Sequence, residues 1–361
     1  MPSLPNDLWW EIIPHAISPE NNLAMVKPSS ERLYPFFPGS FSGFRDTHFY
    51  SSQLAIWKRN NIVAHSFVQV NRLWRGIAER FLYSAFYAEE EWRVQRLIDT
   101  IKLKPKLAKQ LRTLVIMPRI IMTAACFDPL VEQVLGLCDG IVAIVMGLNM
   151  LSSPLPLFQS LDSSRPLLLL SVLGLQDEEF TTFMIHFNNF ASLQVLELSV
   201  TFDVPTFPSF PKHITFPSLH TLILGDLPFD MIVLDVIGKW ELPSLKELSI
   251  SQNLHSFCKP LLPLIQRSYD KLEFFNINLD LLRYRAFLDI TRAPPVHLRN
   301  VTLDMTSSAY SSPPIHPAAE PFFGHIVTLG VTSFGTIRLK DTPAWVRFLS
   351  DPKYMPTFAP C

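Results

Sequence analysis

The chain has 361 residues, of which 48% are hydrophobic and 17% are charged, and its formal net charge is −1. A charged fraction below the roughly 25% of ordinary soluble domains fits a long buried core. A net charge near zero gives no electrostatic attraction to nucleic acid or to an anionic membrane, so neither is expected as a partner. The four cysteines lack paired spacing and no basic secretory leader is visible. Reduced thiols and a cytoplasmic or nuclear location are therefore expected.

An amphipathic helix is expected near the start of the chain, over Asn6–Ile13. Asn6 suits the N-cap because its side-chain oxygen accepts a hydrogen bond from a free backbone N–H. Leu4, Leu8 and Ile12 recur at four-residue intervals and share one face of this helix.

A segment without periodicity, 15–52, follows the first helix. It is rich in proline and glycine and is expected to be a long insert without regular structure. Helical spacing returns over Gln53–His65 and again over Ser66–Tyr83, where Val70 and Trp74 lie four residues apart.

These two helical pieces resemble the two ends of an F-box. Leu4-Pro5-Asn6-Asp7-Leu8 is similar to the family's Leu-Pro-x-Glu-Leu, and the run Val70 to Ala78 is similar to its Val-Cys-x-x-Trp-x-x-Ile/Leu-Ala. Asp7 replaces the commoner Glu, Asn71 stands where Cys is frequent, and the long insert separates the halves, as in the F-box families of fungi. The alternative is a pair of ordinary amphipathic helices that cap the rest of the chain.

The resemblance implies that residues 1–85 form a helical unit that docks the Skp adaptor. The family's adaptor-facing positions fall on Leu4, Pro5, Leu8, Ile12, Val70 and Trp74.

The segment 86–110 is expected to be a connecting helix. Its acidic run, Glu89–Glu91, is expected to remain solvated rather than to bind a partner. The residues expected to pack are Trp92, Val94, Leu97, Ile98 and Ile101.

From residue 111 to residue 331 the pattern Leu-x-x-Leu-x-Leu recurs eight times, most clearly at Leu219/Leu222/Leu224, and a weaker ninth copy begins at Ile326. The spacing of successive first positions is nearly constant, and a fixed period of about 26 residues is typical of repeat architectures. Side chains alternate along a strand, so the first, fourth and sixth positions are expected to be buried in parallel strands. The first positions are Leu111, Ile141, Leu167, Leu193, Leu219, Leu245, Leu272 and Leu298.

Between the strands, four segments carry apolar residues at helical spacing. Each is long enough for one helix and a return loop. The expected helices lie within 177–190, 229–239, 259–269 and 280–292.

The spacing and the leucines resemble leucine-rich repeats of the strand-plus-helix kind. The family's Asn, three positions after the last Leu, is present only as Asn149 and Asn253, so the repeats are degenerate. The resemblance implies an α/β fold: a leucine-rich-repeat solenoid, with a curved parallel sheet and outer helices over 111–331, preceded by the small helical F-box-like unit. Residues 332–361 are expected to form a C-terminal cap and tail. The alternative is an α/β protein with ordinary buried strands.

No catalytic motif is present. The sequence lacks a Gly-rich phosphate loop and a His-Glu-x-x-His metal motif, so no catalytic residue, metal or cofactor is expected. His220 falls on a repeat strand, where an ordinary satisfied polar contact is expected. An enzyme site within the insert is disfavoured because 15–52 holds no coherent acid–base or nucleophile set.

F-box proteins with leucine-rich repeats serve as substrate receptors of SCF-type ubiquitin ligases. The resemblance therefore implies a binding protein without an active site, whose partners are the Skp adaptor with its cullin complex and an unidentified target protein. The alternative is a leucine-rich scaffold that is not linked to ubiquitination.

Target binding is expected at the third and fifth positions of the strands. The side chains at these positions are not needed in the repeat core, and many of them are apolar. An apolar stripe on a protein surface commonly marks a partner site. The alternative is that the C-terminal loop or the helices cover this stripe. The expected target-binding residues are Val195, Glu197, Thr221, Ile223, Glu247, Ser249, Phe274 and Asn276.

Overall fold

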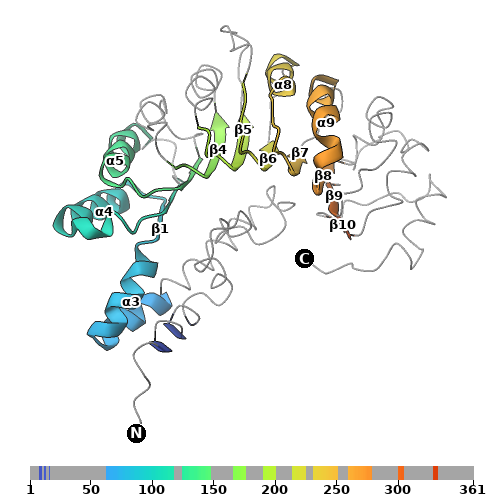
Figure 1. Cartoon of the computed structure of the whole chain (residues 1–361). Helices are drawn as coiled ribbons and strands as arrows, with labels where there is room; N and C mark the ends of the chain where they lie inside the picture. Colours follow the sequence, from blue (N-terminus) through green and yellow to red (C-terminus); the bar gives the residue numbers. More distant parts are fainter. Residues whose placement is uncertain are drawn as a thin grey trace, which may run out of the picture. The chain divides into compact units, whose positions relative to one another are not determined.

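The protein has an α/β fold that combines short parallel strands with helices (Figure 1). The strands belong to one sheet, and their order in the sheet follows their order in the sequence from β1 to β10. Every strand pair with a described register is parallel. The computed structural model describes residues 8–9, 12–13, 16, 62–117, 124–147, 166–175, 190–200, 214–224, 231–250, 259–278, 300–304 and 328–331.

All eight strands expected from the repeats are present, and the ninth, weaker copy forms β10. One strand that the pattern did not predict, β1, precedes them. The strands are β1 (Ala85–Ala88), β2 (Thr113–Ile116), β3 (Ala143–Gly147), β4 (Leu169–Leu175), β5 (Val195–Val200), β6 (Thr221–Leu224), β7 (Glu247–Ile250), β8 (Phe274–Asn278), β9 (Asn300–Asp304) and β10 (Thr328–Val331).

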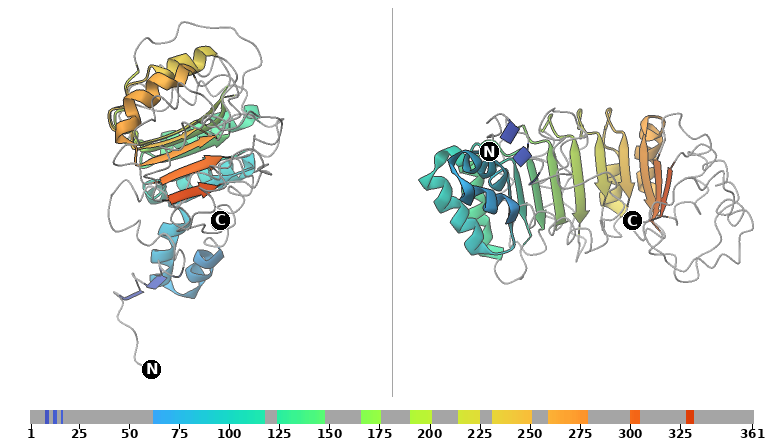
Figure 2. Two further views of the ribbon diagram at one scale, coloured as in Figure 1. Left: turned by 90° about the vertical axis from the view of Figure 1, so that its right-hand side faces the viewer. Right: turned by 90° about the horizontal axis from the view of Figure 1, so that it is seen from below.

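The strand register reproduces the sequence period. Thr221 of β6 pairs with Val195 of β5, one repeat period earlier, and with Glu247 of β7, one repeat period later. Figure 2 shows β5 to β8, drawn from green to orange, running side by side. Equivalent positions of successive repeats therefore lie next to each other across the sheet.

The first, fourth and sixth positions of the repeats are buried, as predicted, wherever the structure describes the side chain; Ile277 and the copies from Leu298 onward lie outside the described side chains. Leu219, Leu222 and Leu224 are each 0% exposed, and Leu248 in the next repeat is also 0% exposed. Burial of a leucine side chain contributes about 1.5–3 kcal/mol, so these rows supply much of the stability of the sheet. The other buried members are Leu111, Leu114, Ile116, Ile141, Ile144, Met146, Leu167, Leu170, Val172, Leu193, Leu196, Leu198, Leu245, Ile250, Leu272 and Phe275.

A recurring pair of backbone hydrogen bonds fixes this register at the start of six strands: β2, β3, β4, β6, β7 and β8. The carbonyl oxygen of His220 accepts from the amide nitrogens of Lys246 (2.8 Å) and Glu247 (2.9 Å). Both of these donors at the strand entrance are thus paired, and an unpaired donor would be costly in a buried position. The same doubly accepting carbonyl occurs at Ser84, Arg112, Val142, Gln194 and Lys246.

Helices connect several pairs of neighbouring strands, whereas the helix Arg72–Leu82 precedes β1 (Figure 1). The helices expected within 229–239 and 259–269 are confirmed, whereas those expected within 177–190 and 280–292 fall almost entirely outside the described residues. Besides the helix at residues 62–70 and the helical residues between 8 and 16, the described helices are α3 (Arg72–Leu82), α4 (Glu91–Leu103), α5 (Ala124–Leu137), α8 (Met231–Gly238) and α9 (Leu262–Ser268), with short 3-10 turns at Pro105–Leu107, Lys259–Leu261 and Tyr269–Lys271.

The connecting segment 86–110 differs from the expected single helix. Its first residues belong to β1, which pairs with β2, and α4 begins only at Glu91. Val94, Leu97, Ile98 and Ile101 are buried as expected. The prediction that Trp92 packs is wrong, because this side chain is 54% exposed.

The chain divides into two compact units, and the division falls between Val172 and Leu173. The first unit contains α3 to α5 and β1 to β3, and the second contains β5 to β10 with α8 and α9. Within the described residues, no helix is both long and apolar enough to cross a membrane.

Candidate interaction surfaces

The helical unit near the amino terminus is built around a small apolar cluster. Ile13, Ala64, Ile77 and Ala78 are buried in it. Ile13 comes from the first helix, whereas the others come from residues 62–82, so the two helical pieces pack together across the long insert, as expected. Further apolar side chains pack against this cluster: Trp9, Val63, Phe67, Val68, Leu73, Trp74, Phe81 and Leu82.

Aromatic rings join the two pieces most directly. The ring centroid of Trp74 lies 4.6 Å from that of Trp9 and 5.2 Å from that of Phe67, with tilted and edge-to-face geometry. Such aromatic pairs contribute about 0.5–1.5 kcal/mol beyond the area they bury. Trp74 is therefore held between the first helix and the helix at residues 62–70, and it is only partly exposed.

These helices also expose large apolar side chains on their surface. Leu8 is 39% exposed, Ile12 is 41% exposed and Val70 is 55% exposed. Leu8 and Ile12 are four residues apart and share one helix face, while the adjacent Ile13 is turned inward. Three predicted adaptor-binding residues are thus available on the surface. Trp74 is half-buried, and Leu4 and Pro5 lie outside the described residues.

Asn71 sets the boundary between the last two helices of this unit. Its backbone is extended (φ −159°, ψ 176°), and its Oδ1 accepts a hydrogen bond from the Trp74 amide at 2.9 Å. The expected continuous helix over Ser66–Tyr83 is therefore wrong: the chain forms one helix at 62–70 and a second, α3, that Asn71 caps.

The predicted target-binding residues are less accessible than expected. Glu247 and Phe274 are half-buried, and the side chain of Asn276 lies outside the described residues. The expectation of an open stripe is wrong for Val195 (4% exposed), Glu197 (3%), Thr221 (4%), Ile223 (1%) and Ser249 (3%).

Polar groups on this covered face bond to each other across strands. The Thr221 hydroxyl donates to Glu247 Oε2 at 2.8 Å, and these two residues are paired in the β6–β7 register. Glu197 and Ser249 lie on the same face and also have interaction partners. Buried carboxylates and hydroxyls are stable only when they are paired, so this row is a structural network.

A second polar row follows the residues that immediately precede the strands. It contains Gln194, His220, Lys246 and Glu273, and the Lys246 ammonium lies 2.8 Å from Glu273 Oε1. Burial, and then the charge of Lys246, lower the pKa of His220 below its ordinary value of 6.5, while Glu273 acts in the opposite direction. The satisfied contact expected for His220 is not found, because its Nδ1 is buried without a hydrogen-bond partner.

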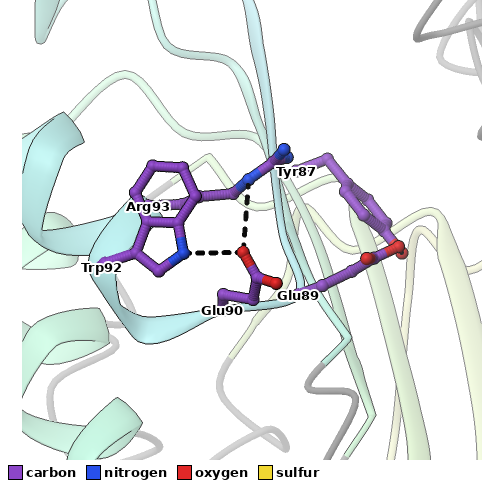
Figure 3. A network of polar contacts seen from close by, with 5 residues as sticks. All are labelled: Tyr87, Glu89, Glu90, Trp92 and Arg93. Carbon is purple, nitrogen blue, oxygen red and sulfur yellow. Dashed lines mark hydrogen bonds and ion pairs between the residues drawn. The ribbon is translucent and has the colours of Figure 1, made fainter.

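A third group of polar contacts lies at the turn from β1 into α4 (Figure 3). The Trp92 indole donates to Glu90 Oε2 at 2.7 Å, and Arg93 lies 3.9 Å from the same oxygen and 5.5 Å from the indole ring. The Tyr87 hydroxyl donates to Glu89 at 2.8 Å. These bonds explain why Trp92 remains at the surface, since its N–H would lose its acceptor inside the core.

The described residues also bear on metal binding and on thiols. Across the described part of the chain, no cluster of three or more His, Cys, Asp or Glu side chains could hold a metal ion. Cys138, a free cysteine, is buried.

No protein-family model matches the chain, and no curated protein matches it in sequence. Among solved structures, a crystal structure of a protein from Bacteroides fragilis is similar over 68% of this chain and 73% of that one, with 13% sequence identity and a TM-score of 0.34. A similarity this low carries no conclusion about function.

Proposed function

We propose that the chain is the substrate-recognition subunit of an SCF-type E3 ubiquitin ligase. In this proposal the F-box-like unit docks the Skp adaptor, the repeats bind a target protein, and catalysis belongs to the partner enzyme of the cullin complex. The observation that supports this proposal is the helical unit of residues 8–82. Ile13 is buried in its apolar cluster, whereas Leu8, Ile12 and Val70 are exposed on its surface.

The repeat region is proposed to be a leucine-rich-repeat solenoid. Support comes from strands that pair only with their sequence neighbours, from the single repeat period that separates Val195, Thr221 and Glu247, and from the buried leucines. One such unit cannot bury its own apolar face, so stacking on its neighbours completes the core.

Target binding is proposed on the strand face that carries Glu247 and Phe274. These two side chains are half-buried, whereas Val195 and Ile223 are 4% and 1% exposed. A target would reach the buried positions only after a rearrangement of the chain. Charged substitutions at Val195 or Ile223 would also unfold the core, so Glu247→Gln and Phe274→Ala are the better probes of target binding.

The adaptor contact is tested by a pull-down with purified Skp adaptor. Leu8→Ala/Ile12→Ala truncates two exposed side chains without touching Ile13. Buried interface anchors are each worth about 2 kcal/mol or more, so capture should fall by at least tenfold. Leu103→Ala/Leu137→Ala is the matched control, because these leucines are 84% and 37% exposed and lie on α4 and α5.

Equal capture of wild type and Leu8→Ala/Ile12→Ala, with unchanged circular dichroism, would remove the F-box proposal. The remaining proposal would then be a leucine-rich scaffold that is not linked to ubiquitination. Co-purification of Skp and cullin with the full chain separates these two functions independently of the variants.

A further inference from the structure

A run of positive charge follows α4. Residues 102–112 hold five cationic side chains and no acidic one, although the whole chain has a net charge of −1. Lys104 lies 3.7 Å from Glu79 of α3. Among the described residues, no ion pair involves the other four. The cationic residues, all exposed, are Lys102, Lys104, Lys106, Lys109 and Arg112.

An exposed leucine lies inside this run. Leu103, the last residue of α4, is 84% exposed, and Lys102 and Lys104 flank it. We call Lys102, Leu103, Lys104, Lys106 and Lys109 the lysine edge. The loop that contains Lys109 lies close to the turn after α5, because a Cβ on Gly140 would lie 3.2 Å from the Lys109 carbonyl oxygen. One carboxylate, Asp139, precedes that glycine, so the charge of the edge stays positive.

Helix stabilisation explains only part of the lysine edge. A lysine in the last turn of a helix interacts favourably with the helix dipole, which accounts for Lys102. Lys106 and Lys109 lie beyond the end of α4, and Leu103 has no charge to contribute. An exposed leucine amid lysines presents apolar surface and positive charge to the same partner.

We propose that the lysine edge is a docking surface for an anionic lipid membrane. The lysines would lie at the level of the headgroups, and Leu103 would insert between them toward the acyl chains. The net charge of the whole chain matters little here, because charges interact over about 8 Å at physiological ionic strength. The proposal does not depend on the adaptor or the target.

Leu103 favours lipid over other anionic partners. Nucleic acid binds to cations and stacking aromatic rings, and residues 102–112 contain no aromatic residue. An acidic protein would need a pocket of its own to receive a side chain that protrudes by itself. A bilayer accepts a protruding apolar side chain without such a pocket.

Co-sedimentation of the full chain with vesicles tests the proposal. Phosphatidylcholine vesicles with 30% phosphatidylserine, an arbitrary test composition of about one third anionic lipid, are compared with pure phosphatidylcholine at low salt. Lys102→Gln/Lys106→Gln removes two unpaired charges, each worth about fivefold in binding to an anionic surface, so partitioning should fall on the order of 20-fold. Leu103→Ala should weaken partitioning several-fold, while Leu103→Ile should retain it.

The control variant is Lys239→Gln/Lys271→Gln, which removes the same net charge from exposed lysines of the second unit. It should change partitioning by less than about twofold. Equal losses in the two double variants, or equal binding of wild type to both vesicle types, would overturn the proposal. Binding to single-stranded RNA or to poly-glutamate that depends on Lys102 and Lys106, without vesicle binding, would replace it with a nucleic-acid or an acidic-protein surface.

Discussion

His220 lies between Gln194 and Lys246 in the row of residues that precede the strands. Its Nδ1 is buried without a hydrogen-bond partner. Protonation would place a second N–H in this position with no acceptor and beside the Lys246 ammonium. Burial and Lys246 therefore lower the pKa of His220, against the weaker opposing effect of Glu273.

This lowered pKa predicts a loss of stability in mild acid. The unfolded chain protonates His220 as pH falls through about 6.5, whereas the folded chain protonates it only at lower pH. The contribution of His220 is thus fully present above pH 6.5 and is lost as pH falls below it. The urea midpoint of wild type should drop more between pH 7.5 and 5.5 than that of His220→Gln.

The control for this experiment is His65→Gln, which removes an exposed histidine from the helix at residues 62–70. His65→Gln should keep the pH dependence of wild type. Identical pH dependence in wild type and His220→Gln would contradict the assignment of this effect to His220.

Individual residues show which side-chain burial could be predicted from the sequence and which could not. Leucines at the first, fourth and sixth repeat positions could be assigned to the core, because strand alternation alone decides which way they face. The burial of Val195 and Ile223 could not be predicted, because alternation places them on the face away from the leucines and says nothing about what covers that face. Helical spacing places Leu8 and Ile12 on one face, but their exposure was expected only from the F-box resemblance, because an apolar helix face usually packs against a core.

Among the helices, α3 has an N-cap hydrogen bond that depends on one atom, Oδ1 of Asn71. Asn71→Ala removes the acceptor for the Trp74 amide and should lower the free energy of unfolding by about 1 kcal/mol. Asn71→Ser keeps an acceptor and should stay within a few tenths of wild type. Urea unfolding followed by tryptophan fluorescence measures both variants, since Trp74 stacks on Trp9. Equal destabilisation by Asn71→Ala and Asn71→Ser would show that this hydrogen bond is not the cause.

Two elements were missed in the sequence, for different physical reasons. The break at Asn71 was hidden because the apolar spacing continues through it, and only the side-chain cap interrupts the helix. β1 was hidden because its inward residues include Phe86 and Ala88 rather than leucines, although Phe86 pairs with Leu114 at the fourth repeat position.

One further repeat position carries a signal that leucine spacing alone overlooks. The residue three places before the first leucine is buried in successive repeats, and its carbonyl accepts from that leucine's amide, as between Phe216 and Leu219 at 3.4 Å. If the repeat pattern had included an apolar residue at this position, it would have been one position longer. Its buried members in the second unit are Phe190, Phe216, Leu242 and Tyr269.

Because the strands follow one another in the sheet in sequence order, we predict that the whole molecule tolerates deletion of one complete repeat. Deletion of 221–246 joins His220 to Glu247, which occupies the register position of Thr221 beside Val195. The shortened chain should keep its circular dichroism per residue and unfold cooperatively, with reduced stability because one stacking interface is lost. Deletion of 221–233 removes half a repeat and should abolish cooperative unfolding. Cooperative folding of both deletions, or of neither, would contradict this interchangeability.

The order β1 to β10 also bears on how the protein is made. Each strand finds its first partner in the strand synthesised just before it. At about 5–20 residues per second, a new strand leaves the ribosome roughly every one to six seconds, and the preceding one is already available as a template. The amino-terminal strands can therefore assemble while the carboxy-terminal ones are still being translated. A pause in translation would delay completion of the sheet, but the strands already made would be paired with their neighbours.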